Sequence, residues 1–164
     1  MIDIKNIDFN PFKKIGDGAL FGVVAGNEKN AMTVSWGGVG IMWNKPVFTV
    51  YVRPTRHTFA LAKASDTATL SFFTALRDNE FEGDVKKMLS YFGTKSGKDI
   101  DKCATLSHRE ENGALFFESA GLTLVGRKIY ESVIDPRGFV DEELDKNYNN
   151  DYHTVWYYEI VGLR

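Results

Sequence analysis

The chain has 164 residues, of which 43% are hydrophobic and 26% charged, a composition that excludes disordered and collagen-like chains. This length predicts a single domain over residues 1–164. The net charge of −2 leaves no strongly cationic surface, so neither a nucleic acid nor a membrane is expected as a partner. One cysteine, Cys103, cannot form an internal disulfide, and residues 1–14 lack the apolar core of a signal peptide. We therefore expect a cytoplasmic location.

Segments rich in Val, Thr and aromatic residues predict strands. In chain order these strands cover residues 20–25, 32–36, 46–52, 67–73, 114–117, 121–130 and 152–161. Their number suggests a sheet that closes on itself. Residues 46–52 are apolar or aromatic in both alternating sets, which is typical of a strand covered on both faces, and this strand is expected at the centre of the sheet.

Helices are fewer. Apolar residues at helical spacing predict a helix from about residue 79 to residue 92, with Gly93 as its stop signal. A shorter helix is expected over 58–64, and a weak polar one over 141–147. Residues 135–138 predict a turn followed by an excursion. The fold class is mainly β with flanking helices, arranged as one barrel.

Several familiar motifs are absent. Two glycine-rich turns, residues 16–21 and 93–99, imitate nucleotide-binding motifs but lack a required glycine or hydroxyl. Three dispersed histidines and one cysteine make no zinc pattern, so no metal site is predicted. No Ser or Cys lies in a nucleophile elbow, which sets hydrolysis aside.

The informative stretch runs from residue 30 to residue 58. Thr33 and Ser35 lie two apart on a predicted strand, so both hydroxyls face one side. Gly37, Gly38 and Gly40 follow and remove side chains where a planar ligand could approach backbone amides. The alternative is a glycine-rich hairpin whose hydroxyls face water.

A second polar group lies at the start of the predicted helix over 58–64. Arg53, Arg56 and Thr58, with the free amides of that helix end, form a cradle suited to a phosphate dianion. The alternative is a helix cap with surface arginines. The basic turn at residues 95–98 would add donors to the same anion, or it is a solvated loop.

Three runs of residues, taken together, resemble a known family. They are Thr33-x-Ser35-Trp36-Gly37-Gly38-x-Gly40-x-x-Trp43-x-Lys45-Pro46-Val47, Tyr51-Val52-Arg53-Pro54-x-Arg56-x-Thr58, and Phe92-Gly93-Thr94-Lys95-Ser96-Gly97-Lys98-Asp99-x-Asp101-Lys102. In this order they resemble the flavin reductase-like, FMN-binding split-barrel family, in particular its flavoredoxin-like branch. The resemblance covers residues 20–130, with a weaker tail at 153–160. It implies a six-stranded Greek-key split β-barrel, a homodimer, and FMN bound near the dimer interface.

The resemblance also assigns site residues. Those implied to bind the cofactor are Asn30, Met32, Thr33, Ser35, Trp36, Gly37, Gly38, Arg53, Arg56, Thr58, Lys95 and Ser96. Arg53, Arg56 and Thr58 fall near the phosphate, and a cation of the basic turn near the ring would stabilise reduced flavin. His153 matches a histidine close to the exposed face of the flavin, with a role in nicotinamide access or proton supply; the alternative is a structural residue.

The sequence departs from the family at three places. His57 stands where relatives have Tyr, and Cys103, where an aliphatic residue is usual, is expected to be a buried apolar residue and not a redox centre. Trp156-Tyr157-Tyr158 replaces a smaller stretch and is expected to narrow the substrate side of the pocket.

Three functions stay open at this point. The first is an FMN-dependent oxidoreductase that takes a hydride from NADH or NADPH. The second is a flavoredoxin-like electron-transfer protein that exchanges electrons with a redox partner protein and does not oxidise nicotinamide. The third is a noncatalytic flavin-binding barrel.

Overall fold

The computed structural model describes residue 4, residues 7–77 and residues 80–164; the expected helix start at residue 79 lies outside them. The strands are β1 (Ala19–Ala25), β2 (Glu28–Val34), β3 (Gly37–Met42), β4 (Lys45–Val52), β5 (Thr67–Phe72), β6 (His108–Glu111), β7 (Ala114–Phe117), β8 (Leu122–Val133) and β9 (Thr154–Leu163). The helices are α1 (Pro11–Gly16), α2 (His57–Ala64), α3 (Val85–Thr94) and the short 3₁₀ helices η1 (Lys102–Thr105), η2 (Pro136–Gly138) and η3 (Glu142–Asn147).

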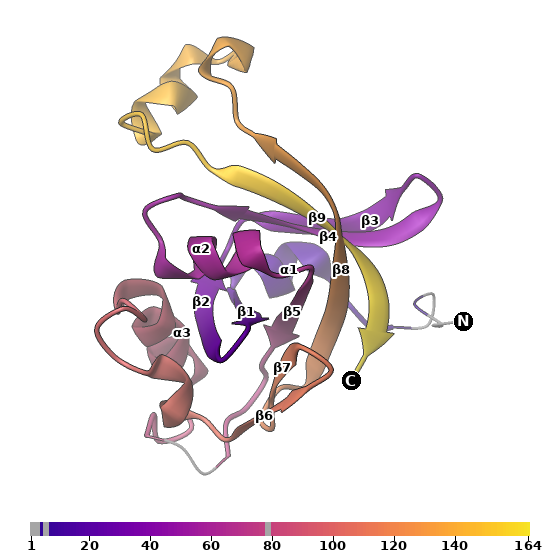
Figure 1. Ribbon diagram of the computed structural model, residues 1–164, viewed down its shortest axis with the longest axis vertical. Helices are drawn as coiled ribbons and strands as arrows, with labels where there is room; N and C mark the ends of the chain where they lie inside the picture. The colour runs from indigo at the N-terminus through magenta and orange to yellow at the C-terminus, as the bar shows by residue number, and fades with distance from the viewer. Residues whose placement is uncertain (1–3, 5–6, 78–79) are drawn as a thin grey trace.

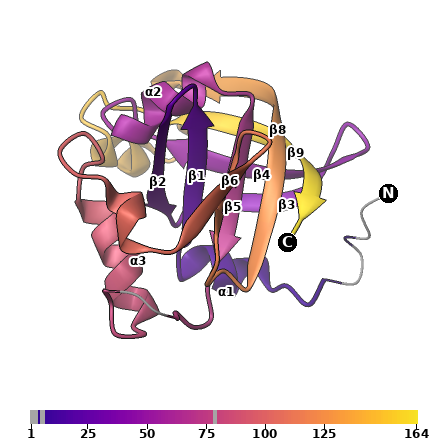
Figure 2. The same ribbon diagram turned by 60° about the horizontal axis from the view of Figure 1, so that its bottom comes forward.

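Seven strands form one antiparallel sheet in the order β2-β1-β5-β8-β9-β4-β3, and β6 and β7 form a separate hairpin. The sheet curls so that β1 and β2 lie across from β4 and β9 (Figures 1 and 2). The mainly β class with flanking helices is confirmed. The expectation of a closed six-stranded barrel is wrong, because the sheet has seven strands and no ladder joins its end strands β2 and β3 in the described residues.

The extra strand is β3, which the sequence did not predict. It pairs with β4 from Gly37 opposite Val50 to Met42 opposite Lys45. Trp43 and Asn44 form the turn with φ of 49° and 58°, the left-handed pair that a tight two-residue hairpin needs. A Cβ on Gly37 would lie 2.4 Å from the Thr49 carbonyl oxygen, so this glycine allows close pairing with β4. The predicted hairpin is therefore confirmed, but the Thr33 hydroxyl before it does not face water, because it donates to the Leu89 carbonyl oxygen.

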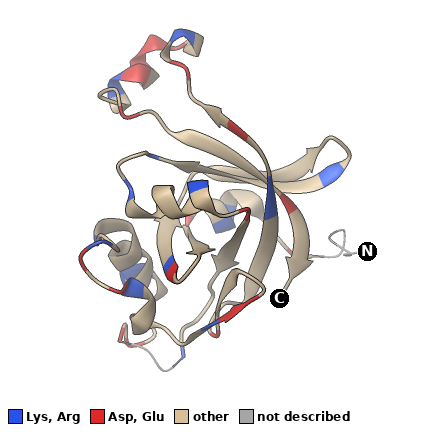
Figure 3. Cartoon of the chain, in the orientation of Figure 1, with Lys and Arg blue, Asp and Glu red and all other residues tan. Residues whose placement is uncertain are grey.

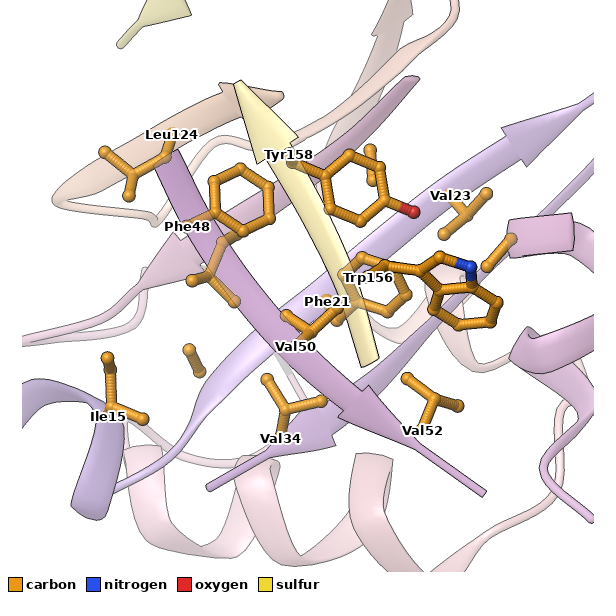
Figure 4. Close-up of a cluster of buried hydrophobic side chains, with 14 of the residues drawn as sticks. Ile15, Phe21, Val23, Val34, Phe48, Val50, Val52, Leu124, Trp156 and Tyr158 are labelled. Carbon is orange, nitrogen blue, oxygen red and sulfur yellow. The ribbon is translucent and has the colours of Figure 1, made fainter. Parts of the chain in front are cut away.

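The main core lies inside the curled sheet (Figure 4). Phe21, Phe48, Trp156 and Tyr158 are fully buried there, and the Phe48 and Tyr158 rings stack at 5.1 Å between centroids. Each such side chain contributes roughly 1.5–3 kcal/mol on burial. The rings fill the space beside Gly126, where a Cβ would meet Phe48 at 2.5 Å.

A second cluster lies on the other face of β1. Leu20 packs there with residues of α3 and β7, including Met88, Phe92 and Leu115. Strand β1 is thus covered on both faces, and the middle strand of the sheet is β8. The expected central position of β4 is wrong, because β4 lies next to the end strand β3.

Helix α3 begins after Asp84, whose side chain accepts a hydrogen bond from the Lys87 amide at 3.0 Å. It continues to Thr94, so the prediction of Gly93 as a stop signal is wrong: Gly93 is the last-turn residue that faces Thr33. Helix α2 confirms the predicted segment, and η2 and η3 confirm the turn and the weak helix of the excursion. None of the described helices has the length and apolarity needed to cross a membrane.

Candidate functional site

Six of the residues predicted to bind the cofactor line one small cavity of about 90 Å³. We call it the anion pocket. The predicted residues are Asn30, Met32, Arg56, Thr58, Lys95 and Ser96. The remaining lining residues are Thr55, His57, Phe92, Gly93, Thr94, Gly97 and Lys102. The pocket thus lies where β2, the start of α2 and the end of α3 meet.

The anion pocket is electropositive. Its lining includes Arg56, Lys95 and Lys102, and no carboxylate among the described residues lines it. The positive end of α2 adds to this charge, since its N-cap residue Arg56 makes no side-chain cap hydrogen bond. Basic positions before α2 and after α3 lie on the same side of the molecule (Figure 3). These groups fit a compact anion such as phosphate.

Two polar side chains hold the wall of the pocket. The buried Asn30 amide donates a hydrogen bond to the Thr58 hydroxyl at 2.8 Å, which ties β2 to the first turn of α2. A Cβ on Gly97 would lie 2.3 Å from the Asn30 side-chain oxygen. The turn after α3 therefore packs directly on Asn30, and glycine is the residue that permits this approach.

Lys102 is a lining residue that the site prediction missed. Its side chain is buried, and its ammonium donates to the Phe92 carbonyl oxygen at 2.9 Å. Burial, and secondarily the charge of Arg56, lowers the pKa of Lys102 to about 8. The lysine ends the third run of the family resemblance, but its burial depends on the packing of η1 under α3, which nothing in the local sequence marks.

A larger open cleft of about 630 Å³ adjoins the anion pocket. Arg56, Gly93 and Thr94 line both hollows. Thr33 and Ser35 line the cleft, which confirms that they share a face, while Val34 between them is buried in the main core. The Thr33 hydroxyl donates to the Leu89 carbonyl at 2.6 Å, so that hydroxyl also anchors α3 to β2.

Other predicted site residues lie outside these two hollows. Trp36 and His153 pack together with ring centroids 5.0 Å apart, and Gly37 and Gly38 belong to β3. Arg53 contacts the segment between β8 and β9, residues 134–153, which we call the excursion. It donates a hydrogen bond to the Asn147 carbonyl oxygen at 3.0 Å. The structure thus brings Arg56 to the pocket and engages Arg53 elsewhere.

His153 is 8% exposed, and its Nδ1 atom has no hydrogen-bond partner in the described structure. Tyr148 packs edge-on against its ring at 5.5 Å. Burial, then the nearby charge of Arg53, lowers the pKa of His153. The neutral imidazole is therefore the favoured form at neutral pH.

Two departures from the family have clear structural outcomes. Cys103 is buried, and burial raises its pKa to about 11, which confirms the apolar role. Trp156 and Tyr158 are in the main core, and Tyr157 packs against Trp43 and Tyr130. The expectation that this stretch narrows the pocket is wrong, because none of the three lines the cleft or the anion pocket.

Neither a protein-family model nor a curated protein sequence matches this chain. Solved structures do. An FMN-binding protein from Thermus thermophilus with bound p-hydroxybenzaldehyde has a TM-score of 0.66 and 20% identity, covering 96% of this chain and 73% of that chain. Flavoredoxin from Methanosarcina acetivorans has a TM-score of 0.66 and 20% identity, covering 100% and 74%.

A third similar structure is the NADH:FAD oxidoreductase SgcE6 of Streptomyces globisporus C-1027, solved with NAD and FAD fragments. Its TM-score is 0.63 at 17% identity, and the match covers 93% of this chain and 79% of that chain. A split barrel domain is also named among the similar structures. The resemblance seen in the sequence is confirmed as a likeness of fold: the chain has the fold of FMN-binding proteins, flavoredoxin and flavin reductases with split-barrel domains.

Proposed function

We propose that the chain is an FMN-binding flavoprotein that transfers electrons from NADH or NADPH through the bound flavin. The observation that carries this proposal is the electropositive anion pocket, which shares Arg56 with an open cleft large enough for a ring system. A phosphorylated ligand with a planar head needs this combination of a small charged hollow and a wide neighbour. The likeness of fold to flavin reductases supports the same assignment.

The residues of the anion pocket fit a phosphate. Arg56 and Lys95 supply charge, Thr58 and Ser96 supply hydroxyls, and the first amides of α2 point their dipole toward an anion. Asn30 is held by Thr58 and keeps this wall in place. We assign Arg53 to holding the excursion instead, because its guanidinium already engages Asn147.

We assign the residues around the proposed flavin ring by their position at the cleft. Thr33 and Ser35 border the cleft, and Trp36, Gly37 and Gly38 continue from this edge into β3. Met32 lines the anion pocket near the proposed tail. Bound FMN would supply a ring that accepts a hydride and passes electrons singly or in pairs.

We further propose that the protein works as a homodimer. Exposed aromatic residues support this: Trp43 and Tyr130 lie 5.7 Å apart between ring centroids and are 54% and 47% exposed. An exposed aromatic patch is typical of a surface that another protein covers.

An anaerobic titration of the FMN-loaded protein tests the function. We expect purified protein to bind FMN through desalting, and NADH or NADPH to bleach the flavin absorbance within seconds. Bleaching only by dithionite or a protein donor would instead identify an electron carrier. A protein that cannot be loaded with FMN would contradict flavin binding altogether.

A further inference from the structure

The excursion is anchored to the rest of the molecule by one buried side chain. Between residues 134 and 152, Tyr148 is the only buried residue, at 6% exposed. Its ring lies 5.4 Å from the Arg53 guanidinium and packs edge-on against the His153 ring. The rest of the excursion stands away from the curled sheet (Figure 1). A few contacts therefore decide whether the excursion is closed on the body of the protein.

A tight turn places an acidic residue beside this anchor. Asn149 and Asn150 have φ of 46° and 62°, a left-handed pair that asparagine tolerates better than most residues. The Asp151 amide donates to the Tyr148 carbonyl oxygen at 2.8 Å and closes the turn. Tyr148 and Asp151 are thus held close together, and both contact the loop before α2.

Asp151 is bound to the wall of the anion pocket. Its carboxylate accepts a hydrogen bond from the Thr55 hydroxyl at 2.8 Å and lies 3.9 Å from the Arg53 guanidinium. Thr55 and the next residue, Arg56, both line the anion pocket. The Arg56 amide donates to the Arg53 carbonyl oxygen at 3.0 Å, so these residues form one compact turn. A carboxylate of the excursion is therefore held next to a pocket that fits an anion.

A structural role alone explains only part of this arrangement. A neutral acceptor on the excursion could take the Thr55 hydrogen bond equally well, whereas a carboxylate adds a negative charge beside the pocket. That charge repels an incoming anion. The closed excursion also keeps the Thr55 hydroxyl and the Arg53 guanidinium occupied as donors. Closure of the excursion and binding of an anion therefore oppose each other.

We propose that Asp151 is an autoinhibitory group: the closed excursion weakens anion binding in the anion pocket, and a bound anion releases the excursion. This inference rests on the anion pocket of the proposed function and adds a regulatory element to it. The two effects are reciprocal, because any factor by which closure lowers the affinity for an anion is also the factor by which the anion favours opening.

Titration with inorganic phosphate at constant ionic strength, followed by NMR, tests the effect on affinity. We expect Asp151→Asn to tighten phosphate binding about 3- to 10-fold, because asparagine keeps an acceptor for Thr55 but removes the charge. Asp135→Asn is the matched control: it removes the same charge from the excursion at a residue that pairs with Arg137. The control should stay within about 1.5-fold of wild type. An unchanged affinity in Asp151→Asn, or an equal gain in the control, would overturn the inference.

Hydrogen exchange of the wild-type protein tests the reciprocal effect. Saturating phosphate should accelerate exchange across residues 139–151 about 3- to 10-fold relative to chloride at the same ionic strength. Tyr148→Ala, which removes the buried anchor but keeps the carboxylate, should tighten phosphate binding by at least about threefold. Unchanged exchange in phosphate, or an unchanged affinity in Tyr148→Ala, would contradict the coupling.

Inorganic phosphate also separates this inference from the proposed function, since it contains no flavin. A protein that shows the coupling to phosphate but cannot be loaded with FMN would contradict flavin binding and leave the role of Asp151 standing. A protein that binds FMN but shows no coupling would contradict the role of Asp151 alone.

Discussion

At the scale of single residues, the surroundings of the buried His153 side chain favour the neutral imidazole over the imidazolium. Trp36 and Tyr148 pack against the imidazole, and Nδ1 lacks a partner in the described structure. Arg53 opposes a positive charge there, and Asp151 only partly offsets it. Protonation of the folded protein therefore costs more than protonation of the unfolded chain.

Replacing His153 should change how stability depends on pH. Because its folded pKa lies below 6.5, the unfolded chain binds more protons between these two values, and the free energy of unfolding falls as pH drops through this window. We expect His153→Gln to flatten this fall below pH 6.5. Urea unfolding at a series of pH values measures it.

Ser132→Ala is the control for that series. Ser132 lies on β8 opposite Val155, two residues from His153 in the sequence, and it carries no group that titrates in this range, so this variant should keep the wild-type slope. A His153→Gln protein with an unchanged slope would show that other groups cause the acid sensitivity.

Arginines 53 and 56 show what the sequence could predict about single residues. Both were assigned to the phosphate because they flank the start of α2, and Arg56 does line the anion pocket. Arg53 instead meets Asn147 and Asp151, about a hundred positions away, and no local pattern encodes such a contact. Lys102 was missed for the same reason, since its burial comes from packing between η1 and α3.

At the scale of elements, alternation and apolar spacing located those with strong apolar faces. Strand β7 has the predicted bounds of Ala114–Phe117, and β4 and α2 begin within one residue of prediction. Strands β3 and β6 were missed because glycines and charged residues carry a weak strand signal. Each gains its conformation from a neighbour, β4 or β7, through ladder hydrogen bonds.

The excursion between β8 and β9 is held to the loop before α2 by a few polar contacts. Arg53 donates to Asn147, its guanidinium lies 5.4 Å from the Tyr148 ring centre, and Thr55 donates to Asp151 at 2.8 Å. We expect Arg53→Ala to accelerate hydrogen exchange across residues 139–151 about fivefold, which corresponds to ~1 kcal/mol for partly exposed contacts.

Hydrogen exchange with mass spectrometry measures this, and Arg137→Ala provides the comparison. Within the part of the chain that the structure describes, Arg137 pairs only with its neighbour Asp135, and its side chain is 88% exposed, so its removal should leave exchange across 139–151 unchanged. Equal exchange in Arg53→Ala and wild type would mean that the aromatic contacts alone hold the excursion.

At the scale of the whole molecule, the predicted and observed sheets agree in the number of strands but not in which strands they contain. The sequence predicted seven strands and the main sheet has seven, but the two sets differ: β7 was counted and lies in a separate hairpin, and β3 was not counted and forms an end of the sheet. Whether the sheet closes depends on the twist summed over all strands and on the pairing of its ends. Neither can be worked out from one strand at a time.

The same scale holds the proposed dimer. Three aromatic rings meet there: Trp43 from the turn between β3 and β4, Tyr130 from β8 and Tyr157 from β9. Their ring centroids lie between 5.5 and 6.1 Å apart. Ile41 on the same hairpin is 69% exposed. Burying such residues against a second copy would remove apolar area from water at roughly 25 cal/mol per Å².

Light scattering coupled to gel filtration tests the dimer, for which we expect a mass of twice 18.5 kDa. Trp43→Asn should shift the protein toward the monomer by at least tenfold in dissociation constant, because an aromatic anchor at an interface is worth about 2 kcal/mol. Asn suits this position because it tolerates the φ of 49° in the hairpin turn. Phe12→Asn, which alters a 91% exposed ring on α1, should leave the mass unchanged. A monomeric wild type would contradict the dimer itself. A Trp43→Asn protein that dimerises as tightly as wild type would show that the dimer contact does not include the aromatic patch.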